Sequence, residues 1–154
     1  MVKIRENDEI VHTSLKVRVR FDYKGVARPS RFFFGGKTIE QVAEETREHK
    51  VALLRNVPIQ GVQIEDIDVS ADVYTVFDDF KGEGVAYAPV LVTIKAETIE
   101  DVIHFIARDE FRKVEIIEPE HMYLSKFDVE RLLFKMNEEL RAYRMDMERR
   151  AELR

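Results

Sequence analysis

The sequence predicts an α+β protein with a mixed, mainly antiparallel sheet, two helices packed on that sheet and a long C-terminal helix. Three observations lead to this prediction. Residues 15–23 alternate apolar and charged side chains, the period of a strand with one solvated face. Residues 88–118 read as strand, helix and strand, and residues 125–154 carry apolar side chains at helical spacing.

The first strand of the predicted sheet spans residues 15–23. Its buried face holds the odd-numbered apolar residues and its solvated face holds Lys16, Arg18, Arg20 and Asp22. We expect a turn to begin at Lys24 and Gly25, and the aromatic residues 31–34 to return as a second strand. Residues up to about 11 show no period and are expected to form a frayed end or an edge strand.

Two helices are predicted to begin with a capping threonine. Thr38 is followed three residues later by Gln41, which is the capping-box pattern, and residues 56–58 end this helix. Thr98 caps a second helix that we expect to run to Phe111. Residues 38–42 and 98–102 nearly repeat each other. Either the chain contains two copies of a strand–helix–strand unit, as in a ferredoxin-like fold, or both segments merely satisfy the same sequence pattern for the start of a helix.

The middle of the chain is rich in β-forming residues. In residues 61–77 the apolar positions change parity near Glu65 and Asp66, which predicts two strands or a bulge at this point. Residues 78–84 are polar and are expected to form a loop. The following strand at 90–94 is apolar on both faces, as in the interior of a sheet, and 114–117 form another strand.

The C-terminal helix is predicted to begin at Ser125, with Asp128 at its third helical position. It is about 40 Å long if helical to the end, whereas a compact domain of this length has a diameter near ~38 Å. Its last turns must therefore overhang or contact another chain. We expect one α+β domain at 1–124 and an oligomerisation or packing element at 125–154, with a heptad-spaced interface formed by Val129, Leu133, Met136, Leu140, Tyr143 and Met147.

Composition excludes several classes of protein. The chain has 154 residues, of which 45% are hydrophobic and 36% charged, which is typical of a globular protein. The absence of cysteine excludes disulfides, thiolate catalysis and cysteine-ligated zinc. No apolar run approaches the ~20 residues of a membrane span, and the N-terminus lacks the apolar segment of a signal peptide. We therefore expect a cytoplasmic protein without a membrane partner.

The net charge of −5 hides a strong asymmetry. Residues 12–37 hold seven basic side chains against one acidic, and residues 62–84 hold seven acidic against one basic. The favoured interpretation is that the two segments lie beside each other in the sheet and pair across strands. The alternative is a regulatory domain that binds nucleic acid through its basic hairpin, with contacts from Lys16, Arg18, Arg20, Arg28 and Arg31.

Motifs that carry catalysis are weak in this sequence. The four histidines lack the close spacings that place two imidazoles on one metal ion. A group of carboxylates in the acidic segment provides a second alternative, a metal-dependent hydrolase that holds Mg²⁺ or Ca²⁺, although no third ligand is evident beside each pair. Its candidate ligands are Asp66, Asp68, Asp78 and Asp79.

The sequence thus favours a non-enzymatic module with a binding or regulatory role. We expect no cofactor. We expect the protein to associate with itself as a homodimer through the C-terminal helix, because this helix is long and heptad-spaced and no catalytic group of residues is evident. The nucleic-acid-binding domain and the metal-dependent hydrolase stay open as alternatives.

Overall fold

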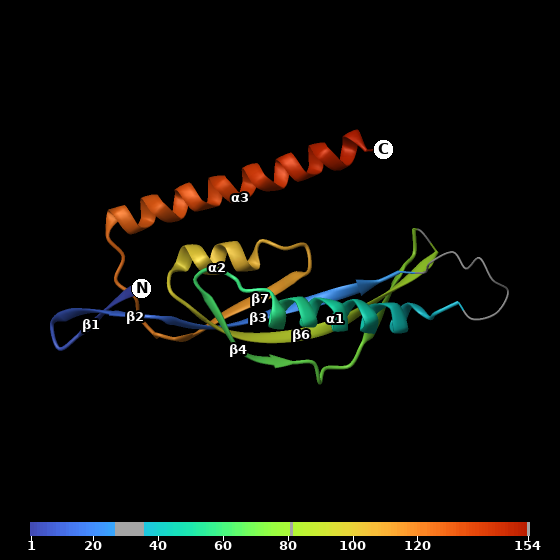
Figure 1. Ribbon diagram of the computed structural model, residues 1–154, viewed down its shortest axis with the longest axis horizontal. Coiled ribbons are helices and arrows are strands. Elements are labelled where there is room, and N and C mark those ends of the chain that lie inside the picture. The colour runs from blue at the N-terminus through green and yellow to red at the C-terminus, as the bar shows by residue number, and fades with distance from the viewer. Residues whose placement is uncertain (27–35, 81, 154) are drawn as a thin grey trace.

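The computed structural model describes residues 1–26, 36–80 and 82–153, and the predicted strand at 31–34 lies outside them (Figure 1). The chain is α+β, as the sequence predicts. Its helices are α1 (Ile39–Asn56), α2 (Ile99–Ile106) and α3 (Lys126–Glu152). Its strands are β1 (Val2–Glu6), β2 (Glu9–Thr13), β3 (Leu15–Gly25), β4 (Val62–Asp68), β5 (Tyr74–Asp78), β6 (Glu83–Ala96) and β7 (Phe111–Glu118).

The main sheet is antiparallel, with strand order β4–β6–β3–β7, and β5 pairs with the first part of β6. One face of the sheet is covered by α1 and α2 (Figure 1). The predicted alternation in β3 is confirmed, since Val17, Val19 and Phe21 are fully buried on this face. They pack with Val90 and Val92 of the neighbouring β6, so the two central strands form the hydrophobic core.

Helix α1 approaches the end of β3 closely. A Cβ atom at Gly25 would overlap backbone atoms of Ile39 and Ala43, and the nearby core is built from alanines, including Ala86 and Ala88. The prediction that Gly25 belongs to a turn is therefore wrong. The residue continues β3 opposite Ala86, and glycine is needed there because the helix backbone lies against it.

The sheet confirms one expectation about β4 and corrects another. The change of parity is a bulge, because the register with β6 shifts between Ile64 and Asp66. Within the described residues, however, no strand residue of the basic segment pairs with one of the acidic segment. Strand β6 lies between the acidic strand β4 and the basic strand β3. The other neighbour of β3 is β7, and the acidic partner of Arg18 is therefore Glu115 of β7.

Two element boundaries also differ from the predictions. Helix α2 ends at Ile106 rather than Phe111, because Phe111 pairs with Phe21 and so starts β7. Strand β6 begins at Glu83, which leaves only residues 79–82 as the connection after β5. The N-terminal residues form the hairpin β1–β2, which turns at two residues with positive φ, Asn7 and Asp8.

Across residues 1–26, 36–80 and 82–153, no helix combines the length and the apolar character that crossing a bilayer requires.

Candidate functional site

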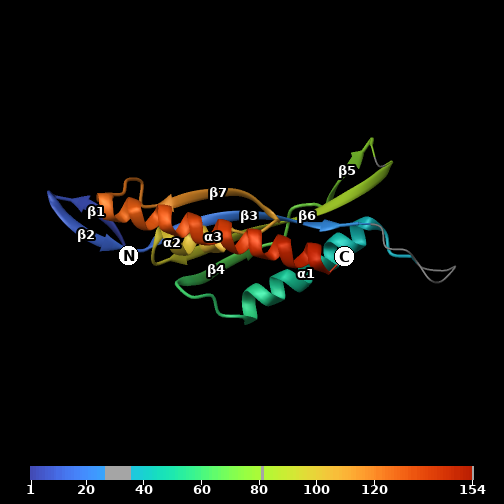
Figure 2. The same cartoon turned by 90° about the horizontal axis from the view of Figure 1, so that it is seen from above.

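Helix α3 lies across α2 on the side remote from the sheet (Figures 1 and 2). It packs on α2 and on no other helix or strand to a comparable extent within the described residues. Only four of its residues are half-buried, and they recur at helical spacing on the side that faces α2. These are Asp128, Leu132, Lys135 and Glu139.

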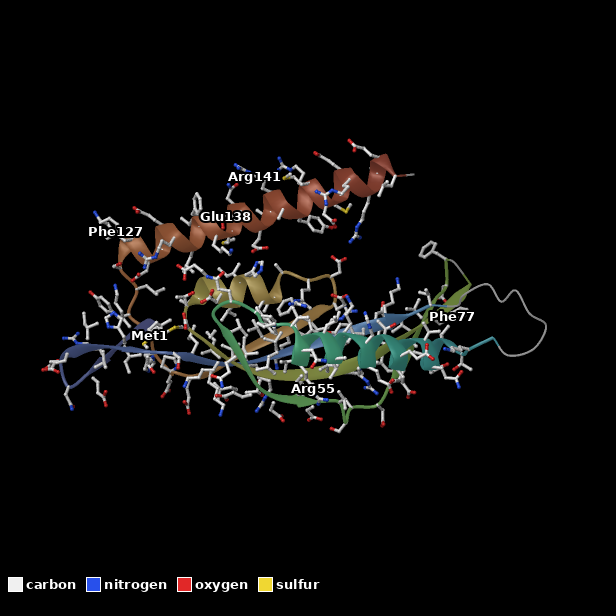
Figure 3. All side chains as sticks on the ribbon, viewed as in Figure 1. Met1, Arg55, Phe77, Phe127, Glu138 and Arg141 are labelled. Carbon is white, nitrogen blue, oxygen red and sulfur yellow. The ribbon has the colours of Figure 1, made fainter. Side chains whose placement is uncertain are left out.

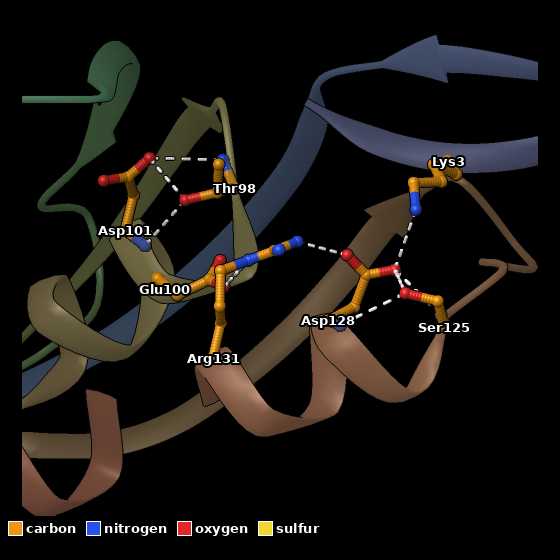
Figure 4. A network of polar contacts seen from close by, with 7 residues as sticks. All are labelled: Lys3, Thr98, Glu100, Asp101, Ser125, Asp128 and Arg131. Atoms are coloured by element: carbon orange, nitrogen blue, oxygen red, sulfur yellow. Dashed lines mark hydrogen bonds and ion pairs between the residues drawn. The ribbon is translucent and has the colours of Figure 1, made fainter. Parts of the chain in front are cut away.

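A polar network fixes the start of α3 (Figure 4). Ser125 and Asp128 form the predicted capping box, in which the Asp128 carboxylate accepts hydrogen bonds from the Ser125 backbone N–H at 2.8 Å and from its hydroxyl at 3.0 Å. The same carboxylate accepts from Lys3 Nζ of β1 at 3.1 Å. The Ser125 backbone bond, followed by Lys3, holds the pKa of Asp128 well below its ordinary value.

Two further contacts hold α3 over α2. Arg131 reaches Glu100 of α2 with 3.5 Å between Nε and Oε1, and it also pairs with Asp128. One turn further along α2, His104 Nδ1 lies 2.6 Å from Glu139 Oε1. Ion pairs and hydrogen bonds, rather than a shared apolar core, therefore position the helix.

The heptad stripe of α3 is left uncovered. None of the 27 residues of α3, all of which the structure describes, is buried. At about 100° per residue, the stripe is centred roughly a quarter turn away from the side that faces α2. Its exposed fractions run from 42% at Val129 to 62% at Leu140, through Leu133, Met136, Tyr143 and Met147.

Strand β7 presents a second exposed apolar surface. Val114 and Ile116 share the helix-covered face of the sheet with Val17 and Val19, which are fully buried. Helices α1 and α2 pack mainly on β3, β4 and β6, and Figure 2 shows β7 beside α3 rather than beneath a helix. Val114 and Ile116 are consequently 37% and 48% exposed.

Three of the predicted basic residues, Lys16, Arg18 and Arg20, occupy the opposite, open face of the sheet. Arg28 and Arg31 lie outside the described residues. Lys16 stands directly opposite Lys95 of β6, and Arg20 directly opposite Lys113 of β7. Arg18 lies beside them and forms a 3.8 Å ion pair with Glu115.

A buried carboxylate on this open face was not predicted. Asp22 Oδ1 accepts from Arg20 Nε at 2.8 Å, and its other oxygen accepts from the Tyr74 hydroxyl at 2.5 Å and lies 3.5 Å from Arg112 Nε. Burial, together with the bond to Asp22, raises the pKa of Tyr74. The alternation of β3 placed Asp22 on the solvated face, and no sequence signal shows that β5 brings Tyr74 over it.

The acidic group gives little support to a metal site. Asp68 accepts from the Ser70 backbone N–H at 2.8 Å and from its hydroxyl at 2.6 Å, and Asp66 is exposed. The side chain of Asp78 is not among the described ones. Within the described residues, no three histidine, aspartate or glutamate side chains are grouped so that they could hold a metal ion.

No protein-family model, curated protein or solved structure matches the chain. The class of protein is therefore defined by its geometry alone: an α+β sheet protein that holds a long, unburied helix with an apolar stripe against its second helix.

Proposed function

We propose that the protein is a self-associating module with a binding or regulatory role, and that two copies meet through the α3 stripe. The observation that carries this proposal is a 27-residue helix without a buried residue whose apolar side chains nevertheless follow a heptad spacing. Large apolar surfaces on one side of a helix are typical of protein–protein contacts.

The way α3 is held supports a partner rather than a loose tail. A helix gains most of its stability from packing of its apolar face, yet this helix is held by the contacts of its start and of Glu139. These contacts leave the stripe turned away from the chain's own core. Covering each stripe residue from roughly half exposure is worth on the order of 1 kcal/mol, which a second copy supplies for both helices at once.

The exposed face of β7 adds to this surface. Val114 and Ile116 are apolar and lie on the core-facing side of the sheet, but no helix in the described part of the chain covers them. A second copy docked on α3 offers apolar side chains that can cover them. We include these two residues in the proposed interface.

The body that carries α3 is, in this proposal, a ferredoxin-like unit. Apart from β5, which lies between β4 and β6, the succession β3–α1–β4–β6–α2–β7 follows the strand–helix–strand–strand–helix–strand pattern of that fold. All pairs of the main sheet are antiparallel, and both helices lie on one face. In such a fold the function resides in the surfaces added to the unit, here α3.

The burial and the contacts of Asp22 favour a binding role over catalysis. It is the one buried charged residue in the described part of the chain, and Arg20 and Tyr74 already engage its carboxylate. A general base needs a carboxylate that can accept a substrate proton, and this one is enclosed by its partners.

The test compares two pairs of substitutions on α3. Leu133→Glu with Leu140→Glu places charges in the stripe, whereas Phe134→Glu with Met145→Glu places them on another side of the same helix at 66% and 55% exposure. We expect the stripe pair to abolish dimers in multi-angle light scattering and the control pair to leave them. Equal behaviour of both pairs, with helicity unchanged, contradicts the proposal.

A second candidate function is binding of nucleic acid on the open face of the sheet. The observation in its favour is that two pairs of like charges stand directly opposite each other, Lys16 with Lys95 and Arg20 with Lys113. Such pairs destabilise a sheet, and an anionic ligand relieves the repulsion. Two of these four cations also have an acidic neighbour in their own strand: Arg20 pairs with Asp22, and Lys113 pairs with Glu115.

This candidate is tested by a gel shift with single-stranded RNA and DNA at low salt. Lys95→Glu should weaken binding at least several-fold and reduce its salt dependence, while Arg55→Glu on α1 should not. Absence of any shift for the wild-type chain, or equal loss in both variants, removes this function.

A further inference from the structure

We propose that the two α3 helices pair antiparallel about a two-fold axis, an inference that rests on the self-association proposed above. The stripe steps along the chain by four, three, four, three and four residues, which reads the same in both directions. An antiparallel partner therefore matches every stripe residue with another stripe residue. The layers are Val129 with the partner's Met147, Leu133 with the partner's Tyr143, and Met136 with the partner's Leu140.

The spacing also keeps the stripe straight. From Val129 to Met147 the chain advances 18 residues, which is five complete turns of an α-helix. The two ends of the stripe consequently point in the same direction. Both halves of α3 can then contact one straight partner along its whole length.

The charges on one flank of the stripe match in the same register. On the flank that points away from α2, antiparallel pairing places Glu130 beside the partner's Arg144, while Asn137 meets its own copy. All three side chains are exposed. Neither Glu130 nor Arg144 has an ion-pair partner among residues 1–26, 36–80 and 82–153. Both are therefore free to pair between chains.

A parallel pair lacks this match. It would bring Arg144 toward the partner's Glu139 on the other flank of the stripe. Glu139 lies on the side that faces α2, its side chain is 19% exposed, and it is already bound to His104 and Lys135. The antiparallel arrangement also sets the positive end of one helix dipole near the negative end of the other.

Charge reversal on the flank tests the orientation. We expect Glu130→Arg and Arg144→Glu each to weaken the dimer about tenfold, because each turns two interchain attractions into repulsions. The chain that carries both substitutions should recover to within about threefold of the wild-type dissociation constant, measured by sedimentation. Arg141→Glu makes the same charge change on the outer side of α3, where Figure 3 labels this residue, and should have no effect.

A disulfide provides an independent measurement, since the chain has no cysteine of its own. Asn137→Cys should form a disulfide-linked dimer under mild oxidation, whereas Leu133→Cys should not, because an antiparallel partner places the two sulfurs introduced at that position about 15 Å apart. A disulfide-linked dimer of Leu133→Cys overturns the antiparallel arrangement, and so does a double charge variant whose dissociation constant does not recover. Both results leave self-association itself intact. A wild-type chain that stays monomeric overturns self-association itself.

Discussion

Asp22 joins three strands from the solvent-facing side of the sheet. It belongs to β3, accepts from Tyr74 of β5 and lies beside Arg112 of β7, whose guanidinium stands 5.1 Å from the centre of the Tyr87 ring. The Asp22 carboxylate holds the arrangement together, because Tyr74 and Arg112 are both hydrogen-bond donors and need an acceptor at this point. Sequence reasoning could place Asp22 on the open face but not predict its burial, since the strand that covers it is 52 residues away.

Asp22→Asn tests the importance of this carboxylate for stability. The amide cannot satisfy two arginines and a tyrosine, so we expect a loss of about 1.5–3 kcal/mol in the free energy of unfolding. Urea denaturation followed by circular dichroism measures the loss. Asp66→Asn, at an exposed position, should change stability by less than about 0.5 kcal/mol, and similar losses in both variants would show that the Asp22 contacts are weak.

Asp128 gives a prediction about pH. Its pKa is depressed in the folded chain by the Ser125 backbone N–H and by Lys3, so its contribution is present above the unfolded pKa of about 3.9 and is lost as the pH falls toward the folded value. The gap in melting temperature between wild type and Asp128→Asn should therefore be largest near neutral pH. It should narrow as the pH is lowered from about 5 to 2. A gap that is independent of pH would contradict the assigned interaction.

At the scale of the element, Gly25 sets how closely α1 lies on the sheet. Gly25→Ala would force a methyl group into the backbone of α1, so we expect a loss of about 3 kcal/mol in stability. Gly84→Ala is the matched control, because its Cβ would meet only the flexible ends of Ile39, at 3.2 Å, and Thr75. Thermal unfolding of both variants measures the difference. Equal melting temperatures would show that α1 shifts without cost.

Local patterns predicted the starts of the elements well. The capping boxes at Thr38 and Ser125 and the cap at Thr98 are confirmed, because each depends on contacts within four residues. The predicted end of α2 is wrong because a distant strand decides where the helix stops: Phe111 pairs with Phe21 of β3. Long-range pairing overrides local propensity at such points.

The N-terminal hairpin carries a signal that sequence reasoning missed. Asn7 and Asp8 are residue types that tolerate positive φ, and two such residues between short runs are typical of a hairpin turn. Attention to this pair would have decided between the two expectations for this segment, a frayed end or an edge strand, in favour of strands. The hairpin matters for the site, because its Lys3 binds the start of α3.

On the scale of the whole molecule, the strand order decides which predicted residues meet. The basic and acidic segments were expected to be neighbours, but β6 lies between the basic strand β3 and the acidic strand β4, and composition cannot reveal this order. The same order puts β7 at an edge and leaves Val114 and Ile116 exposed. The six stripe residues could be selected from spacing alone, since a heptad pattern describes one side of one helix without reference to the sheet.

The central claim is that two copies of the chain meet through α3, and the mass of the intact protein in solution tests it most directly. Sedimentation equilibrium from about 1 μM to 1 mM should give a mass that rises toward twice the 18.1 kDa of the chain. The same series on Leu133→Glu with Leu140→Glu should stay at the mass of one chain. A wild-type mass of 18.1 kDa over the whole range would contradict the claim.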